Sequence, residues 1–270
     1  MQRNREILSQ WTRWLAVLGL SSIFTVVASS EAVAKSSAET VREEKTVIVD
    51  GSREVWRLVW EDRPSAFCGA ADAPSALTCP CSGFAYGEQG KLALVRAKGD
   101  GTEERLELGS AFNPKTFFEG GLESGHAALS RWPVLDSDLG HQDDGTLATA
   151  VPKRPLTDVM QLADYDHDGQ ATQFLLQVDS QPSGKREMVL VGVSRQQPHL
   201  HIFSSVEEPQ KPLVLGVWVW EALRRSSGET DAIEWMCGDH LSEVEKRVYL
   251  RVRNGKISAQ RQSRQCPDQG

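Results

Sequence analysis

Apolar and polar residues alternate along much of the chain after residue 45, a period typical of β-strands with one buried face. The alternating runs come in pairs at 46–49 with 55–60, 92–96 with 105–108, 188–193 with 200–203, and 247–252 with 256–258. In the last pair Asn254 and Gly255 stand between the runs, and Asn-Gly at that place strongly indicates a tight hairpin turn. We therefore expect a mainly β fold, a sandwich or curved antiparallel sheet with a few short helices.

Helical periodicity is limited to two stretches. Residues 217–225 place apolar side chains at helical spacing, and so do residues 156–163. Residues 109–155 contain several Gly and Pro residues without a clear period, which predicts a long irregular excursion.

The first residues have the pattern of an export signal. Arg3, Arg5 and Arg13 come first, an uncharged apolar run covers 14–28, and small residues follow at 32–34. This arrangement predicts a secretory signal peptide over residues 1–34. The apolar run is about 15 residues long and a membrane span needs roughly 20, although an uncleaved N-terminal anchor is the alternative. The expected location is secreted or periplasmic.

The rest of the chain has the length and charge of one acidic domain. Residues 35–45 are polar and predict a flexible leader, and residues 46–270 predict a single β-rich domain. The whole chain has a formal net charge of −7, and the mature part has −8 because residues 1–34 carry three Arg and two acidic residues. Such acidity argues against nucleic acid as a partner. The mature part contains no further apolar stretch of spanning length, so we expect no membrane partner after signal removal.

All five cysteines belong to the mature chain, and export permits disulfides. They are Cys68, Cys79, Cys81, Cys237 and Cys266. Two bridges among five thiols allow fifteen pairings, and locality favours one bridge within residues 68–81 and another from Cys237 to Cys266. The remaining cysteine of the Cys79–Cys81 pair is then a spare thiol, or the pair serves as a redox or soft-metal site.

The most informative stretch is acidic and begins at Asp164. Aspartates occupy alternate positions at Asp164, Asp166 and Asp168, and Gly169 follows directly. Calcium prefers six to eight oxygen ligands, and three carboxylates on a curled chain can converge on one ion. The backbone carbonyl of Gln170 would complete the turn, and Thr172 would hold a bridging water. The alternative is an acidic surface turn whose Asp side chains cap their own backbone.

Residues 164–175 resemble the calcium loops of EF-hands and, more closely, those of FG-GAP repeats, where a D-x-D-x-D-G turn leads into a strand. Residues 174–178 look like such a strand. The chain departs from both patterns, with Leu175 where an EF-hand has Glu and Thr172 where an FG-GAP loop has Asp. The resemblance implies calcium binding, and the missing acids predict a weak site. Another segment could supply a further carboxylate ligand, and the candidates for it are Asp136, Asp138, Asp143 and Asp144.

Other chemistry-bearing residues are less specific. His199 and His201 alternate in an expected strand, so that with His240 or Asp239 they are candidates for a zinc site. The chain is also rich in tryptophan, which lies mostly in cores and occasionally binds sugars or peptides. The tryptophans of the mature part include Trp56, Trp60, Trp132, Trp218, Trp220 and Trp235.

Two functions follow from these patterns. The first is an exported calcium-binding β domain that acts as a non-catalytic binding or structural module, with the ion as a structural pin and an unknown extracellular or periplasmic ligand. The second is an exported hydrolase with a calcium-supported site in residues 109–150, or with a zinc site formed by His199, His201 and His240. No serine-nucleophile elbow of the G-x-S-x-G type occurs in the sequence.

Overall fold

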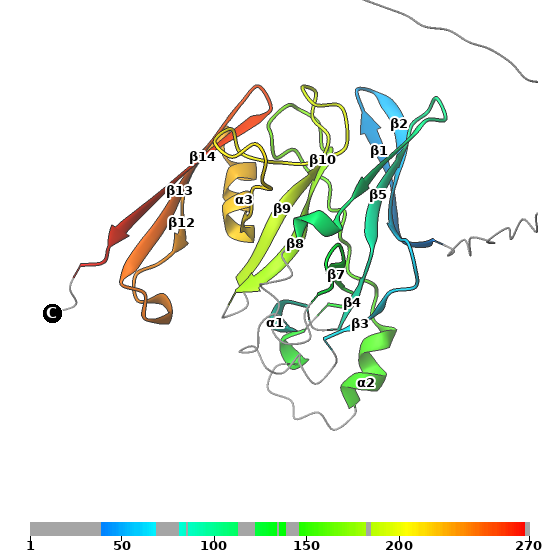
Figure 1. Ribbon diagram of the computed structural model, residues 1–270, viewed down its shortest axis with the longest axis horizontal. Helices are drawn as coiled ribbons and strands as arrows, with labels where there is room; N and C mark the ends of the chain where they lie inside the picture. Colours follow the sequence, from blue (N-terminus) through cyan, green and yellow to red (C-terminus); the bar gives the residue numbers. More distant parts are fainter. Residues whose placement is uncertain are drawn as a thin grey trace, which may run out of the picture. The chain divides into compact units, whose positions relative to one another are not determined.

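The alternating runs fold into antiparallel sheets, which confirms the mainly β prediction (Figure 1). The computed structural model describes residues 39–68, 81–84, 86–112, 122–133, 135–138, 146–181 and 185–267. The strands are β1 (Thr40–Val49), β2 (Ser52–Trp60), β3 (Ser65–Phe67), β4 (Gly87–Gly90), β5 (Leu92–Ala97), β6 (Glu103–Glu107), β7 (Ala127–Ser130), β8 (Gln173–Gln181), β9 (Lys185–Gly192), β10 (His201–Ile202), β11 (Leu215–Gly216), β12 (Glu229–Trp235), β13 (Val244–Arg253) and β14 (Lys256–Gln265). The helices are α1 (Cys81–Phe84), α2 (Thr146–Ala150) and α3 (Val217–Arg225).

Within the described residues the strands form four sheets. Three of them have the orders β1-β2-β5-β6, β3-β4-β7 and β12-β13-β14, and in the fourth β9 pairs with β8, β10 and β11. All four expected hairpins are present, and their strands are longer than most of the alternating runs that predicted them.

Strand β9 lies between two hydrophobic cores. Val189 and Val191 pack into the core shared with the β1-β2-β5-β6 sheet, whereas Met188 and Leu190 pack into a second core with α3 and β13. Successive side chains of a strand point to opposite faces, so a strand covered on both sides is apolar at every position. The continuous apolar run 188–191 therefore joins the two halves of the domain.

Two hairpin turns require backbone in the left-handed region. Asp50 and Gly51 have φ of 47° and 79°, and Asn254 and Gly255 have φ of 51° and 68°. Positive φ at both central residues is the type I′ geometry, which matches the twist of the flanking strands. The Asn254–Gly255 prediction is confirmed.

Two expectations at the level of secondary structure were wrong. Strand β1 begins at Thr40, so residues 40–45 are not part of a loose leader. Arg42 explains this difference, because its buried guanidinium donates to Glu88 at 2.7 Å and secures the start of the strand. Residues 156–163 are not helical, since the carboxylate of Glu43 accepts the backbone N–H groups of Val159 and Met160 at 2.8 and 3.0 Å.

The expected signal peptide, residues 1–34, lies outside the described residues. In the part of the chain that the structure describes, no helix has the length and apolar character needed to span a membrane.

The tryptophans divide between core and surface. Trp56, Trp60 and Trp220 are at most 1% exposed and belong to the two main cores. Trp132 and Trp235 are partly buried, and Trp218 is 36% exposed.

The disulfide between Cys237 and Cys266 is present, as locality suggested, with Cα atoms 5.7 Å apart. It ties the segment after β12 to the end of β14. Cys68 is also disulfide-bonded. Cys79 and the side chain of Cys81 lie outside the described residues.

Replacing both Cys237 and Cys266 by Ser is expected to lower the free energy of unfolding by roughly 3–4 kcal/mol, because the bond joins cysteines 29 residues apart in the sequence. Urea denaturation of the oxidised variant measures the loss. A variant is preferable to a reducing agent, which would also attack the bond of Cys68. The rate of amide hydrogen exchange should rise first in β12–β14. An unchanged midpoint of urea denaturation would contradict the expectation.

Candidate metal centre

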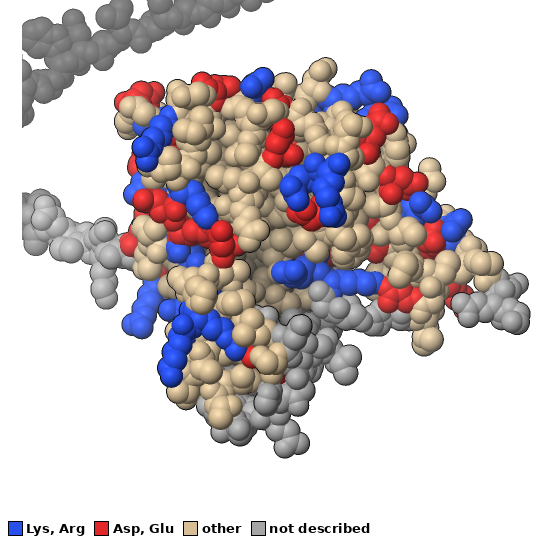
Figure 2. Space-filling model, turned by 180° about the vertical axis from the view of Figure 1, so that it is seen from behind, with Lys and Arg blue, Asp and Glu red and all other residues tan. Residues whose placement is uncertain are grey.

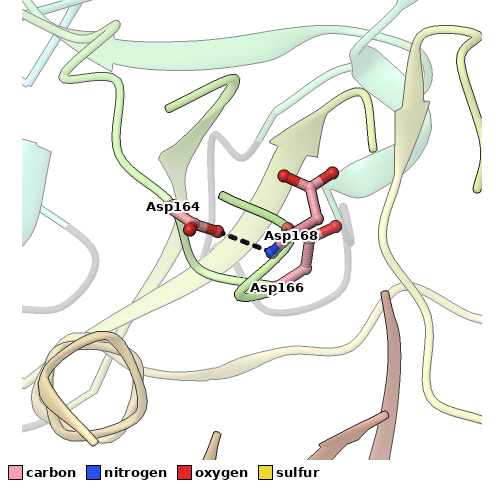
Figure 3. Close-up of side chains that lie close together, drawn as sticks. All are labelled: Asp164, Asp166 and Asp168. Atoms are coloured by element: carbon pink, nitrogen blue, oxygen red, sulfur yellow. Dashed lines mark hydrogen bonds between the residues drawn. The ribbon is translucent and has the colours of Figure 1, made fainter. Parts of the chain in front are cut away.

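Three carboxylates meet in the loop before β8. One carboxylate oxygen each of Asp164, Asp166 and Asp168 lies within 4.8 Å of the others. Figure 3 shows the three side chains on a single turn of the backbone. Three oxygens gathered within this separation can approach one cation, because calcium takes oxygen ligands at about 2.3–2.6 Å in flexible geometry. The Asp triad predicted from the sequence is thus assembled, and it is the one such group of three or more His, Cys, Asp or Glu ligands among the described residues.

Backbone N–H groups hold the carboxylates in place. Asp164 accepts hydrogen bonds from the N–H groups of Asp168 at 3.1 Å and Gly169 at 2.9 Å. Asp168 accepts from the N–H groups of Gln170 at 2.9 Å and Arg195 at 2.7 Å. These bonds fix the orientation of the side chains and leave further lone pairs on the oxygens free.

Asp166 differs from an ordinary surface acid. Its residue is 1% exposed, and its Oδ2 has no hydrogen-bond partner in the described chain. Burial, together with the charges of Asp168 and Asp164, raises its pKa from 3.8 to about 7. A buried, unpartnered carboxylate oxygen costs free energy unless a cation or proton compensates it.

The β13–β14 turn borders the buried oxygen of Asp166. A Cβ atom at Gly255, in the β13–β14 turn, would lie 3.5 Å from Oδ2 of Asp166 and 2.2 Å from Oε1 of Gln196. The side-chain amide of Gln196 makes no hydrogen bond with the described chain. The turn that borders Asp166 therefore also borders Gln196, and no pattern in the sequence pointed to this neighbour.

The remaining residues of the expected loop have specific partners. The side-chain amide of Gln170 pairs with Asp50, donating to Oδ1 at 2.9 Å and accepting from its backbone N–H at 2.7 Å. The hydroxyl of Thr172 donates to the carbonyl of Val193 at 2.9 Å, and the residue is fully buried. The loop then runs into β8, so residues 174–178 form a strand rather than the exiting helix of an EF-hand.

No family model, curated protein or solved structure matches the chain. The chemistry of the site is therefore interpreted from its own geometry.

The loop touches three other segments of the chain. Gln170 reaches the β1–β2 turn, Asp168 reaches the backbone of Arg195 after β9, and Nε2 of His167 lies 3.0 Å from the carbonyl of Leu223 in α3. A change in the conformation of the loop would therefore alter its contacts with all three segments.

The histidines considered for zinc have other neighbours. His199 faces Glu104, with Nδ1 3.3 Å from Oε1, and its side chain is 76% exposed. His201 stacks on Phe203 with ring centroids 4.1 Å apart. The side chain of His240 lies outside the described residues.

The extra carboxylates sought for the loop are engaged elsewhere or not described. Asp138 is buried and binds Arg154 through two hydrogen bonds of 2.6 and 2.7 Å. The hydrogen bonds from Arg154 lower the pKa of Asp138. Residues 143 and 144 and the side chain of Asp136 lie outside the described residues.

Proposed function

We propose that this chain is an exported calcium-binding β domain, a non-catalytic module in which the ion acts as a structural pin. The observation that carries the proposal is the buried Oδ2 of Asp166, which has no hydrogen-bond partner in the described chain and lies beside two further aspartates. A simple capped turn would expose this oxygen to water or pair it with an N–H group. A cation shared with Asp164 and Asp168 supplies the missing partner.

The donor set favours calcium over softer metals. All three triad ligands are carboxylate oxygens. Hard cations prefer such ligands, and calcium tolerates irregular geometry better than magnesium does. The loop has few acids for a calcium site, so the expected dissociation constant is on the order of 10⁻⁴–10⁻³ M, as in extracellular modules.

The contacts of the loop explain how an ion would act as a pin. By drawing the three carboxylates together, it would fix the backbone of residues 164–170 and the partners of that backbone in the β1–β2 turn, in α3 and after β9. The elements that carry these partners contribute to both cores of the domain. The ion would then stabilise the contact between the cores without taking part in a reaction.

Export is part of the proposal. The pattern of residues 1–34 supports it, and so does the disulfide between Cys237 and Cys266, because disulfides persist mainly in oxidising compartments.

Calorimetric titration of the metal-free protein with calcium chloride tests the proposal. We expect one site per chain with a dissociation constant on the order of 10⁻⁴–10⁻³ M. Metal analysis of protein purified without chelator gives an independent measurement. Stoichiometric zinc, or the absence of both heat and thermal shift at millimolar calcium, would contradict the calcium assignment.

A further inference from the structure

A hollow of about 520 Å³ lies next to the loop that carries the three aspartates. Its walls come from α1, β7, β8, β9 and α3, and Tyr165, which stands between two of the aspartates, belongs to its lining. Figure 2 shows one face of the molecule hollowed near its centre, with basic and acidic side chains around the rim. The volume is within the range of about 300–1,000 Å³ that small-molecule sites occupy.

The floor of the hollow is apolar and firmly packed. Phe84, Leu129, Tyr165 and Met188 line it, and each is at most 8% exposed. The ring of Tyr165 packs edge-on against Trp220, and its hydroxyl donates to Glu221 at 3.0 Å. A floor held in this way is preformed, so a ligand would not have to order it.

Charge is unbalanced among the lining residues. Asp158 is paired with Lys45 at 2.8 Å, and Glu221 is paired with Arg224 at 2.8 Å. The exposed side chain of Arg186 has no hydrogen bond or ion pair with the described chain. The two acids are neutralised by their partners, so among the described lining residues one positive charge remains uncompensated at the edge of the hollow.

We infer that this hollow binds a small organic carboxylate with an apolar or aromatic body. The body fills the space over Phe84, Leu129 and Met188, and the carboxylate pairs with the guanidinium of Arg186, whose planar fork matches that group. A phosphate dianion fits less well, because the single guanidinium of Arg186 balances one negative charge and leaves the second one of the dianion without a partner. The inference goes beyond the proposed function, because the pocket binds its ligand whether or not a metal pins the loop.

Isothermal titration with 4-phenylbutyrate, and with 4-phenylbutan-1-ol as its neutral analogue, tests the inference. The acid should bind about 10- to 100-fold more tightly than the alcohol, the ratio typical of a hydrogen bond to a charged group. Arg186→Gln should remove this preference and leave the affinity for the alcohol unchanged. Arg53→Gln, which alters an exposed Arg on β2, should keep the preference.

The outcomes separate this inference from the metal proposal. Equal binding of acid and alcohol, or an unchanged preference in Arg186→Gln, would overturn the carboxylate assignment. Tighter binding of 2-phenylethyl phosphate than of the carboxylate would overturn it as well. The titrations are run with 10 mM calcium and again with chelator, and the preference for the acid should appear in both, even if the calcium titration described above fails.

Discussion

Asp166→Asn should make the metal-free protein more stable and abolish its stabilisation by calcium. At pH 8 the wild-type side chain is ionised although it is buried, and two neighbouring carboxylates repel it. Asn has the same shape without the charge, so the free energy of unfolding without metal should rise by about 1–3 kcal/mol. With 10 mM calcium the difference in unfolding free energy between variant and wild type should shrink or reverse. Calcium binding at a site of the expected affinity adds about 1.4–2.7 kcal/mol to the stability of the wild type alone.

Thermal denaturation with and without calcium measures both effects. A stabilisation of 1 kcal/mol corresponds to about 2–4 °C for a domain of this size. Asp62→Asn is the matched control, because it removes an exposed carboxylate that has no partner in the described chain. It should keep the wild-type stability and the full calcium shift. If the metal-free Asp166→Asn variant were less stable than the wild type, the carboxylate would stabilise the turn without a metal, which would contradict its role as a calcium ligand.

The second large effect concerns a buried ion pair in the first sheet. Glu54 and Arg96 are at most 5% exposed and share two hydrogen bonds of 2.6 and 2.9 Å. Arg96→Met should cost about 3–5 kcal/mol of unfolding free energy, because it leaves the Glu54 carboxylate buried without its cation. The double variant with Glu54→Gln should recover much of this loss, which urea denaturation of the variants measures.

A matched surface variant makes this prediction specific. Lys211→Met breaks an exposed pair with Glu208, joined at 2.8 Å, and should cost less than about 1 kcal/mol. If Lys211→Met cost as much as Arg96→Met, burial would not be the cause.

The pH dependence of the Glu54–Arg96 pair has a definite sign. Burial alone raises the pKa of Glu54, but hydrogen bonds from Arg96 and Trp56 outweigh it and bring the pKa below its ordinary value of 4.5. The stabilisation by Glu54 is therefore present above pH 4.5 and is lost as the pH falls through the lowered pKa. In Arg96→Met burial acts without the opposing guanidinium, so the stability gap between wild type and variant should narrow on acidification.

The fold was predictable wherever local patterns determine it. The alternating runs gave four hairpins, and Asn254–Gly255 gave its turn, because strand period and turn geometry depend on neighbouring residues. The predictions failed where a distant side chain intervened. Arg42 and Glu88 order residues that look like a polar leader, and Glu43 takes the backbone N–H groups that a helix at 156–163 would need.

The candidate site shows the same division. The aspartates and Gly169 are close in sequence, so their convergence could be predicted. Oδ2 of Asp166 lies beside the β13–β14 turn, which also borders Gln196 and lies far along the chain from the loop. Nothing in the loop itself indicates those neighbours.

The bond between Cys237 and Cys266 also determines how the domain responds to a mechanical load. It encloses β13, β14 and their turn in one covalent ring. A tether on the C-terminus would therefore transmit its force from Cys266 across the sulfurs to Cys237 and into β12, which packs on α3. The last hairpin would carry no tension, and about 100 Å of contour length would stay hidden from a pulling device until the ring is reduced.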